Sequence, residues 1–277
     1  MIPYGKHEIN QQDIDSVVKV LKSDFITQGP LVPKFESKVC NYSGAKYAVA
    51  VNSATSALHL ACLSLNLGHG DWLWTSPITF VASANCGLYC GAQIDFVDID
   101  SNTHNISIEA LTYKLKNAEI EGKLPKILIP VHFSGNPCDM LSIYNLSLRY
   151  GFQVIEDASH AIGAKYKENP VGNCKYSDIT VFSFHPVKMI TTGEGGMALT
   201  NDETLAKKMV RLRSHGITKN IDEMDAMDCG PWYYEQIELG FNYRMTDIQA
   251  ALGISQIDRL DYYVNKRNLL ADRYCQL

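Results

Sequence analysis

Runs of apolar residues alternate with amphipathic stretches along most of this chain. Tyr47–Val51 and Asp178–Phe184 are apolar and β-prone, which is typical of strands buried on both faces of a sheet. The pattern predicts strands at 47–51, 72–76, 94–98, 126–132, 152–156, 178–184 and 196–200, and helices at 11–22, 54–66, 80–89, 108–118, 140–150 and 203–214. Such alternation predicts an α/β fold with a mostly parallel sheet covered by helices.

The pattern also suggests how the chain divides. Residues 1–245 contain all of these elements and are expected to form one large α/β domain. Residues 249–277 have the spacing of one long amphipathic helix that stops without a cap. We therefore predict that 246–277 begins a small C-terminal domain whose remainder is absent. The stretch 224–243 is long for a structureless loop, so it is either functional or poorly ordered.

Composition narrows the class of protein. The chain has 277 residues, 46% of them hydrophobic, which is enough for a large core. A net charge of -5 and a pI near 5.9 give no reason to expect nucleic acid or an acidic membrane as partner. No apolar run approaches the roughly 20 residues of a membrane span, and the N-terminus has no signal-peptide layout. The eight cysteines are scattered, and Cys86 and Cys90 indicate core packing rather than a metal site. A cytoplasmic enzyme fits these features.

One lysine stands beyond the carboxyl end of a predicted buried strand. Ligands of open α/β sheets bind at that edge. Lys188 follows the strand 178–184 and precedes the glycine-rich run 191–196, where backbone can approach a ligand closely. Desolvation at such a place lowers the pKa of a lysine toward that of a usable amine nucleophile. An ordinary loop lysine is the plain alternative.

Other strands deliver polar and aromatic groups to the same edge. These are Ser53, Ala54 and Thr55 at a helix start, then Phe80, Asp157, His160 and Ser183. A helix start with hydroxyls suits a phosphate, although Ser53 and Thr55 could simply cap the helix. Taken singly, Phe80 could be a core residue, Asp157 a solvated charge and His160 a satisfied polar residue.

Together these residues meet the requirements of pyridoxal phosphate. The cofactor needs a lysine amine, a carboxylate for its ring nitrogen, an aromatic face and a phosphate cup. Lys188 would hold the aldehyde as a Schiff base, and Asp157 would keep the pyridine nitrogen protonated. A cofactor-binding regulator without turnover remains an alternative. A metal hydrolase built on His132, His160 and His185 lacks any HExxH-like spacing.

Several motifs resemble one family of enzymes. They are Val51–Leu58, Glu156–Gly163, Phe182–Lys188, Gly193–Gly196, Arg213–Gly216 and Gly240–Asp247. In this order, over a likeness running from Tyr4 to the end of the chain, they resemble the DegT/DnrJ/EryC1/StrS aminotransferases of nucleotide-sugar biosynthesis. The resemblance implies the aspartate-aminotransferase-like architecture (fold type I), with a mixed seven-stranded sheet and a small C-terminal domain. It also implies a homodimer that shares its active sites.

The resemblance assigns roles to particular residues. It places the Schiff base on Lys188 and the pyridinium partner at Asp157. The implied cofactor contacts are ring stacking by Phe80, the phenolic oxygen to His160, and the phosphate to Ala54, Thr55, Ser183 and Asn242 of the other subunit. The residues implied in binding a UDP-sugar are Tyr4, Thr27 and Ser53, with His185 as a discriminator within the family.

Ser-Phe-His at 183–185 resembles the members that make 4-amino sugars. The implied reaction moves the amino group of L-glutamate to C4 of a UDP-4-keto-6-deoxy-N-acetylhexosamine, for pseudaminic acid. Another UDP-4-keto sugar, of the aminoarabinose type, is an alternative substrate. A pyridoxal-phosphate sugar dehydratase is an alternative reaction, but such relatives typically carry histidine where Lys188 stands.

Overall fold

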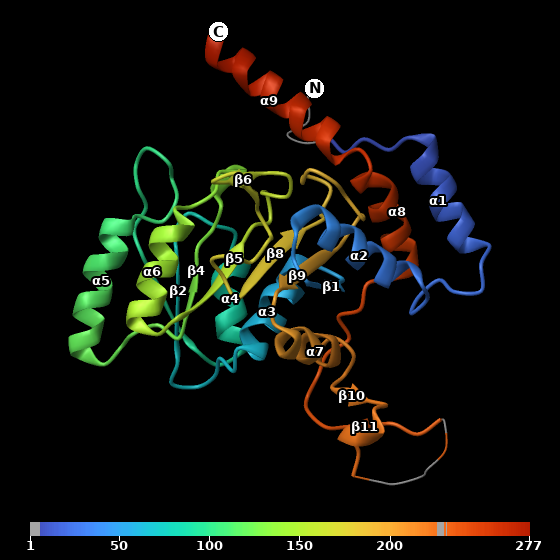
Figure 1. Cartoon of the computed structure of the whole chain (residues 1–277), viewed down its shortest axis with the longest axis horizontal. Coiled ribbons are helices and arrows are strands. Elements are labelled where there is room, and N and C mark those ends of the chain that lie inside the picture. Colours follow the sequence, from blue (N-terminus) through green and yellow to red (C-terminus); the bar gives the residue numbers. More distant parts are fainter. Residues whose placement is uncertain (1–5, 226–229, 231) are drawn as a thin grey trace.

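The computed structural model describes residues 6–225, 230 and 232–277, and its centre is a seven-stranded sheet. The strand order is β1-β9-β8-β5-β4-β2-β3 (Figure 1). β9 runs antiparallel to both of its neighbours, β1 and β8, and the other pairs are parallel. The strands are β1 (Tyr47–Val51), β2 (Trp72–Thr75), β3 (Gln93–Phe96), β4 (Ile127–Ile129), β5 (Gln153–Asp157), β8 (Ile179–Ser183) and β9 (Gly196–Thr200). The predicted α/β fold with a mixed, mostly parallel sheet is confirmed.

Helices cover both faces of the sheet (Figure 1). They are α1 (Gln11–Leu21), α2 (Leu31–Ser43), α3 (Ala54–Ser64), α4 (Ala82–Tyr89), α5 (Ile108–Glu121), α6 (Met140–Tyr150), α7 (Glu203–Leu212), α8 (Asp247–Ile257) and α9 (Leu260–Gln276). Alternate strand residues face opposite cores. Ile127 and Ile129 pack with α3 and α7, whereas Leu128 packs with α5 and α6. α2 and α8 cover the end of the sheet near β1, β9 and β8.

The short paired segments lie outside this sheet. They are β6 (Lys165–Tyr166) with β7 (Asn169–Pro170), and β10 (Ile217–Thr218) with β11 (Glu235–Gln236). Part of the stretch 224–243 falls outside the described residues, so the prediction about its order is untested. Cys86 is fully buried in the core and Cys90 packs against that core, as predicted. No helix in the described ranges could span a membrane.

One helix was not predicted from the sequence. α2 begins at Leu31 and ends at Ser43, and the Gly44 that follows has a φ of +83°, the left-handed conformation common after a helix. Pro33 masks the helix in the sequence, yet it lies in the first turn, where proline is tolerated. α2 buries Phe35 and Val39 in the core.

The single helix predicted over 249–277 is wrong. α8 ends at Ile257 and α9 begins at Leu260, because Arg259 has a non-helical ψ of 6°. Ile257 and Leu260, on either side of the break, are both buried in the same core. After Leu260, α9 leaves the body of the molecule (Figure 1). α8 packs against α1 and α2, within the body of the molecule. A domain boundary at 246 stays a prediction.

A partly buried ion pair covers the free edge of strand β1. Arg213 Nη1 lies 2.6 Å from Glu36 Oε1 and donates to the carbonyl of Ala50 at 2.7 Å. The same Glu36 oxygen accepts the Ala50 amide at 2.8 Å. The two side chains thus satisfy the main-chain groups that an edge strand leaves unpaired.

We expect Arg213→Ala to lower the free energy of unfolding by about 1–2 kcal/mol, because Glu36 loses its cationic partner in a partly buried setting and the carbonyl of Ala50 loses its donor. Urea denaturation measures the change. Lys207→Ala is the matched control, since its pair with Glu203 is solvent-exposed and its loss should leave stability unaltered. Equal stability of the two variants would contradict the protective role of Arg213.

Candidate active site

Asp157 is the last residue of β5, and its carboxylate is buried at the carboxyl edge of the sheet. The residue is only 5% exposed. Oδ2 accepts the Ser83 hydroxyl at 2.6 Å, and Oδ1 accepts the Ser159 hydroxyl at 2.6 Å. Among the described residues no cationic side chain forms a salt bridge with it. Buried charges are normally paired, so this carboxylate has the setting of one that receives a cation from a ligand.

Glu156, the neighbouring residue, faces the opposite side of the sheet. Its carboxylate lies 2.7 Å from His132 Nε2 and accepts the hydroxyl of Thr180 at 2.9 Å. His132 Nδ1 accepts the Cys138 amide, so Nε2 carries the proton. The structure therefore separates the two carboxylates and leaves Asp157 alone at the edge.

Lys188 and His160 lie together beside Asp157. Lys188 Nζ is 2.6 Å from His160 Nε2. Partial burial lowers the pKa of Lys188 below its usual value, although the negative charge of Asp157 opposes the shift. Desolvation and the Lys188 charge both lower the pKa of His160, although Asp157 opposes the shift, so its ring is neutral and accepts a hydrogen bond from Lys188 Nζ. The partial burial of Lys188 thus raises the fraction present as a free amine.

A third part of the site lies where α3 begins. The amides of Ala54 and Thr55 find no acceptor within the part of the chain that the structure describes. Gly196 lies against this helix start, because a Cβ there would come within 2.4 Å of the Ala54 nitrogen. Ser183 is the strand partner of Gly196. Free amides, a helix dipole and a nearby hydroxyl make an anion site suited to phosphate.

For Phe80, Ser53 and His185 the structure gives a position but no contact that assigns a role. Phe80 lies between β2 and α4 and is 73% exposed, so its ring is uncovered. Ser53 caps α3 by accepting the Ser56 amide at 3.1 Å, which confirms the capping alternative. His185 is exposed. Their roles toward cofactor or substrate stay predictions.

The roles of three further predicted site residues, Asn242, Thr27 and Tyr4, also stay predictions. The main chain of Asn242 lies beside α3 of its own chain, where its carbonyl accepts the Asn52 side chain at 3.4 Å. Thr27 is exposed and bridges to Thr246. Tyr4 lies outside the described residues. No contact of these residues with a ligand follows from the geometry, and sharing of Asn242 across a dimer stays a prediction.

The sequence did not reveal three residues of the site. Ser83 comes from α4 and reaches Asp157 only through tertiary packing, so no local signal marks it. Ser159, two residues after Asp157, makes a local turn that the spacing could have indicated. Arg267 on α9 donates to the carbonyl of Lys188 at 3.3 Å and so fixes the loop that carries the lysine.

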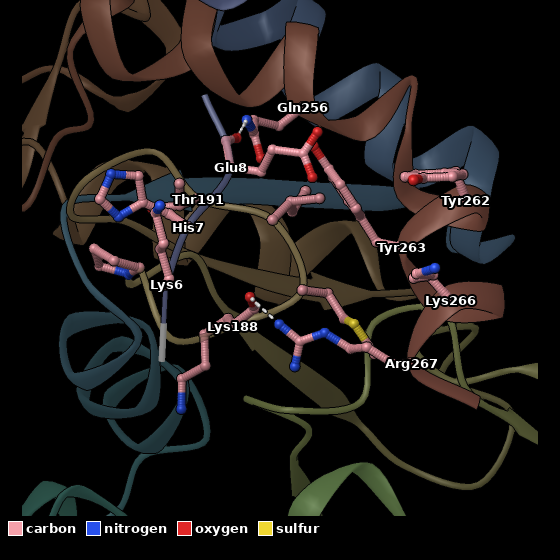
Figure 2. A pocket seen from close by; sticks show the side chains of 13 residues that line it. Lys6, His7, Glu8, Lys188, Thr191, Gln256, Tyr262, Tyr263, Lys266 and Arg267 are labelled. Atoms are coloured by element: carbon pink, nitrogen blue, oxygen red, sulfur yellow. Dashed lines mark hydrogen bonds between the residues drawn. The ribbon is translucent and has the colours of Figure 1, made fainter. Parts of the chain in front are cut away.

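A cavity of about 220 Å³ lies behind this loop. Thr191, Gln256, Tyr263 and Arg267 are among its lining residues. Figure 2 shows the Lys188 amine pointing away from Gln256 and Tyr263. The cavity therefore adjoins the main chain of Lys188, while the amine faces the side of Asp157 and His160.

These residues fit pyridoxal phosphate. An unpaired buried carboxylate suits its ring nitrogen, a desolvated amine suits its aldehyde, and free helix amides suit its phosphate. Fold and site together define a pyridoxal-phosphate enzyme of the aspartate-aminotransferase architecture. The comparisons with known proteins give the particular family.

The chain belongs to the DegT/DnrJ/EryC1/StrS aminotransferase family, whose profile matches residues 7–277. It is 43% identical over 275 residues to the UDP-4-amino-4,6-dideoxy-N-acetyl-beta-L-altrosamine transaminase of Campylobacter jejuni subsp. jejuni serotype O:2. That match covers 99% of this chain and 69% of the relative. The chain is thus an aminotransferase by family.

Solved structures agree with this assignment. The PseC aminotransferase of Helicobacter pylori, involved in the biosynthesis of pseudoaminic acid, has a TM-score of 0.83 at 33% identity, covering 94% of this chain and 66% of that one. A structure from Streptococcus pneumoniae in its PLP-form has a TM-score of 0.86 at 30% identity, covering 99% of this chain and 71% of that one. The chain thus spans about two thirds of the length of these relatives. Pyridoxal phosphate is the cofactor of the family.

Proposed function

We propose that this protein transfers the amino group of L-glutamate to C4 of a UDP-4-keto-6-deoxy-N-acetylhexosamine, giving UDP-4-amino-4,6-dideoxy-N-acetyl-β-L-altrosamine in pseudaminic acid biosynthesis. The observation that carries the proposal is the position of the Lys188 amine beside the carboxylate of Asp157, which has no salt-bridge partner among the described residues, at one sheet edge. The likeness to the Campylobacter enzyme supports the substrate. A cytoplasmic homodimer that shares its active sites is part of the same proposal.

The chain's own residues divide the chemical work. Bound pyridoxal phosphate supplies an aldehyde for the amino group and a ring that withdraws electrons from the adjacent carbon. Lys188 takes the proton from Cα of the amino donor in the first half of the reaction and delivers a proton to C4 of the sugar in the second half. Asp157 keeps a positive charge on the ring nitrogen, and the Ser83 and Ser159 hydroxyls hold that carboxylate in place.

His160 and the helix start of α3 position the other groups. His160, neutral at physiological pH, accepts a hydrogen bond from Lys188 Nζ and so orients the amine. The amides of Ala54 and Thr55, with the hydroxyl of Ser183, would hold the phosphate. Phe80, Tyr4, Thr27, Ser53 and His185 are proposed to contact the ring or the UDP-sugar.

The proposed reaction has a direct test. Purified protein is given pyridoxal phosphate, L-glutamate and the UDP-4-keto-6-deoxy-N-acetylhexosamine, and 2-oxoglutarate and the UDP-amino sugar are measured. We expect both products in equal amounts. A UDP-4-keto sugar of the aminoarabinose type serves as the competing substrate. Faster amination of that sugar would show that it, and not the N-acetylhexosamine, is the substrate. Loss of a sugar hydroxyl without consumption of glutamate would indicate a dehydratase.

Sharing of the active site predicts complementation between inactive chains. Lys188→Ala and Asn242→Ala chains should each be inactive or impaired, because one lacks the amine and the other a phosphate contact for its partner. Mixed dimers should regain part of the activity if Asn242 acts across the interface. Verified mixed dimers without recovery would show that Asn242 does not serve the partner's site.

A further inference from the structure

Residues 25–31, here called the Gly29 loop, are held in place by one buried carboxylate. Asp247 Oδ2 accepts the Gly29 amide at 2.7 Å, and Oδ1 accepts the Leu31 amide at 2.8 Å. Pro30 between them has no amide hydrogen to offer. Asp247 is completely buried and forms no salt bridge among the described residues. Its negative charge is therefore stabilised by the main chain of this loop.

Further contacts tie the loop to the same place. The Asp247 amide donates to the carbonyl of Ile26 at 3.1 Å, and Thr27 bridges to Thr246. A Cβ on Gly29 would come within 2.9 Å of Asp247 Oδ1 and 2.5 Å of the Phe25 Cβ. Glycine at 29 is thus required for the close approach of the loop to the carboxylate.

The loop also has a strained backbone. Gln28 has a φ of +54°, in the left-handed region of backbone conformation that residues other than Gly and Asn rarely adopt. Such conformations persist only where the surroundings impose them, and they are frequent at ligand clamps. The bonds from Gly29 and Leu31 to Asp247 supply that constraint.

The main chain of the Gly29 loop is bonded to Asp247, whereas the side chains of the loop are exposed and can contact a ligand. Phe25 and Ile26 are 55% and 52% exposed, and Thr27 beside them is exposed as well. Exposed apolar side chains next to a site are typical of ligand-binding surfaces. Because the main chain is fixed, the loop would bind without first paying the entropy of ordering.

Asp247 also comes directly after residues 243–246, a segment that lies beside the start of α3, where the phosphate of the cofactor is proposed to bind. Val51 bridges to Arg244, and the Asn52 amide donates to the carbonyl of Tyr243 at 2.8 Å, just before α3 begins. One continuous stretch, 243–247, therefore contacts both the start of the phosphate site and the Gly29 loop. The two parts are held at a fixed separation.

We propose that Asp247 is a positioning residue for the nucleotide part of the substrate, acting through the Gly29 loop. The inference rests on the proposed function, because it takes the loop and Thr27 to contact a uridine diphosphate sugar. It assigns Asp247 no part in the chemistry of Lys188. Its removal should therefore weaken binding of the nucleotide sugar and spare the reaction with the amino donor.

Asp247→Asn tests this separation, because the amide keeps the shape but replaces one accepting oxygen with a donor. We expect the KM for the UDP-4-keto sugar to rise about tenfold or more, as for the loss of a hydrogen bond to a charged group. The single-turnover reaction with L-glutamate, followed by the cofactor absorbance, should stay within about twofold of the wild type. Asp247→Glu, which restores a carboxylate, should recover part of the affinity.

Two further measurements do not depend on turnover. Hydrogen exchange of the Gly29 and Leu31 amides should accelerate in Asp247→Asn, and the affinity for UDP, measured by calorimetry, should fall about tenfold. Asp258→Asn, directly after the same helix, is the matched control, since its carboxylate is exposed and, among the described residues, pairs with Lys38. It should alter none of these quantities. If Asp247→Asn fails to fold, Gly29→Ala displaces the loop from its other side and should raise the same KM.

Each outcome decides the question. Unchanged exchange, unchanged UDP affinity or an equal loss in both half-reactions would overturn the role of Asp247. A wild-type protein that binds no UDP would overturn it as well. If UDP binds in an Asp247-dependent way but the keto sugar is not aminated, the proposed reaction is wrong and the positioning role stands.

Discussion

Lys188→Ala should abolish transamination, with kcat falling by more than about 10³-fold. The loss exceeds that of a single stabilising interaction because the side chain is both the attachment point of the cofactor and the group that moves the proton. The structure supports this role, since Lys188 is partly desolvated, has a lowered pKa and donates to the neutral ring of His160. Steady-state kinetics with L-glutamate and the keto sugar measures the loss.

The variant should still bind the cofactor noncovalently. The helix start at Ala54 and the carboxylate of Asp157 remain in place. Absorbance spectra should therefore show bound cofactor without the band of the lysine-linked form. Lys165→Ala, in the exposed hairpin of β6 and β7, is the control and should retain full activity. A visible band in Lys188→Ala that borohydride bleaches, with the cofactor still attached to the protein after dialysis, would contradict the assignment.

Asp157→Asn has the second largest expected effect, a fall in kcat of about 10²–10³-fold, equivalent to about 2.7–4 kcal/mol. An amide cannot keep a positive charge on the ring nitrogen, so the ring withdraws electrons less strongly. Cofactor binding should persist, because the phosphate site at α3 is untouched. Spectral titration measures binding, and single-turnover kinetics with L-glutamate measures the rate.

Glu156→Gln provides the contrast, because the neighbouring carboxylate lies on the other face of the sheet with His132. That variant should lose stability, since His132 Nε2 would then face an amide group. Its kcat should remain close to that of the wild type. A larger loss of kcat in Glu156→Gln than in Asp157→Asn would reverse the roles of the two carboxylates.

Residues whose place depends on strand ends could be predicted from the sequence. Asp157 ends one buried strand and Lys188 follows another, and parallel topology brings such positions to one edge of the sheet. The helix start at Ala54 follows the same rule. These strands could be recognised as runs of apolar residues, because a strand that is buried on both faces of a sheet consists mostly of apolar residues.

Residues that depend on tertiary packing escaped prediction. Ser83 is an ordinary helical serine until α4 docks beside β5 and its hydroxyl meets Asp157. The break between α8 and α9 lies at Arg259, and no glycine or proline in the sequence marks it. α2 was not predicted because the sequence suggests a helix break where none occurs. Pro33 is a typical helix breaker, but it lies in the first turn, where proline is tolerated.

The Gly29 loop shows how local sequence and distant packing combine. Its glycine and proline signal a turn, but the carboxylate that holds it comes from 218 residues further along the chain. Such a contact carries no periodic signal. Only the fold places Asp247 beneath the loop, and only then does the requirement for glycine at 29 become clear.

The central claim is that Lys188 binds the cofactor covalently, with Asp157 facing the ring nitrogen. Borohydride reduction of the wild-type protein with pyridoxal phosphate, followed by protease digestion and mass spectrometry, tests it most directly. We predict the mass of one phosphopyridoxyl group on Lys188 within the peptide that contains Phe184 and His185, and on no other lysine in comparable yield. Stoichiometric labelling of a different lysine, with Lys188 unmodified, would contradict the account.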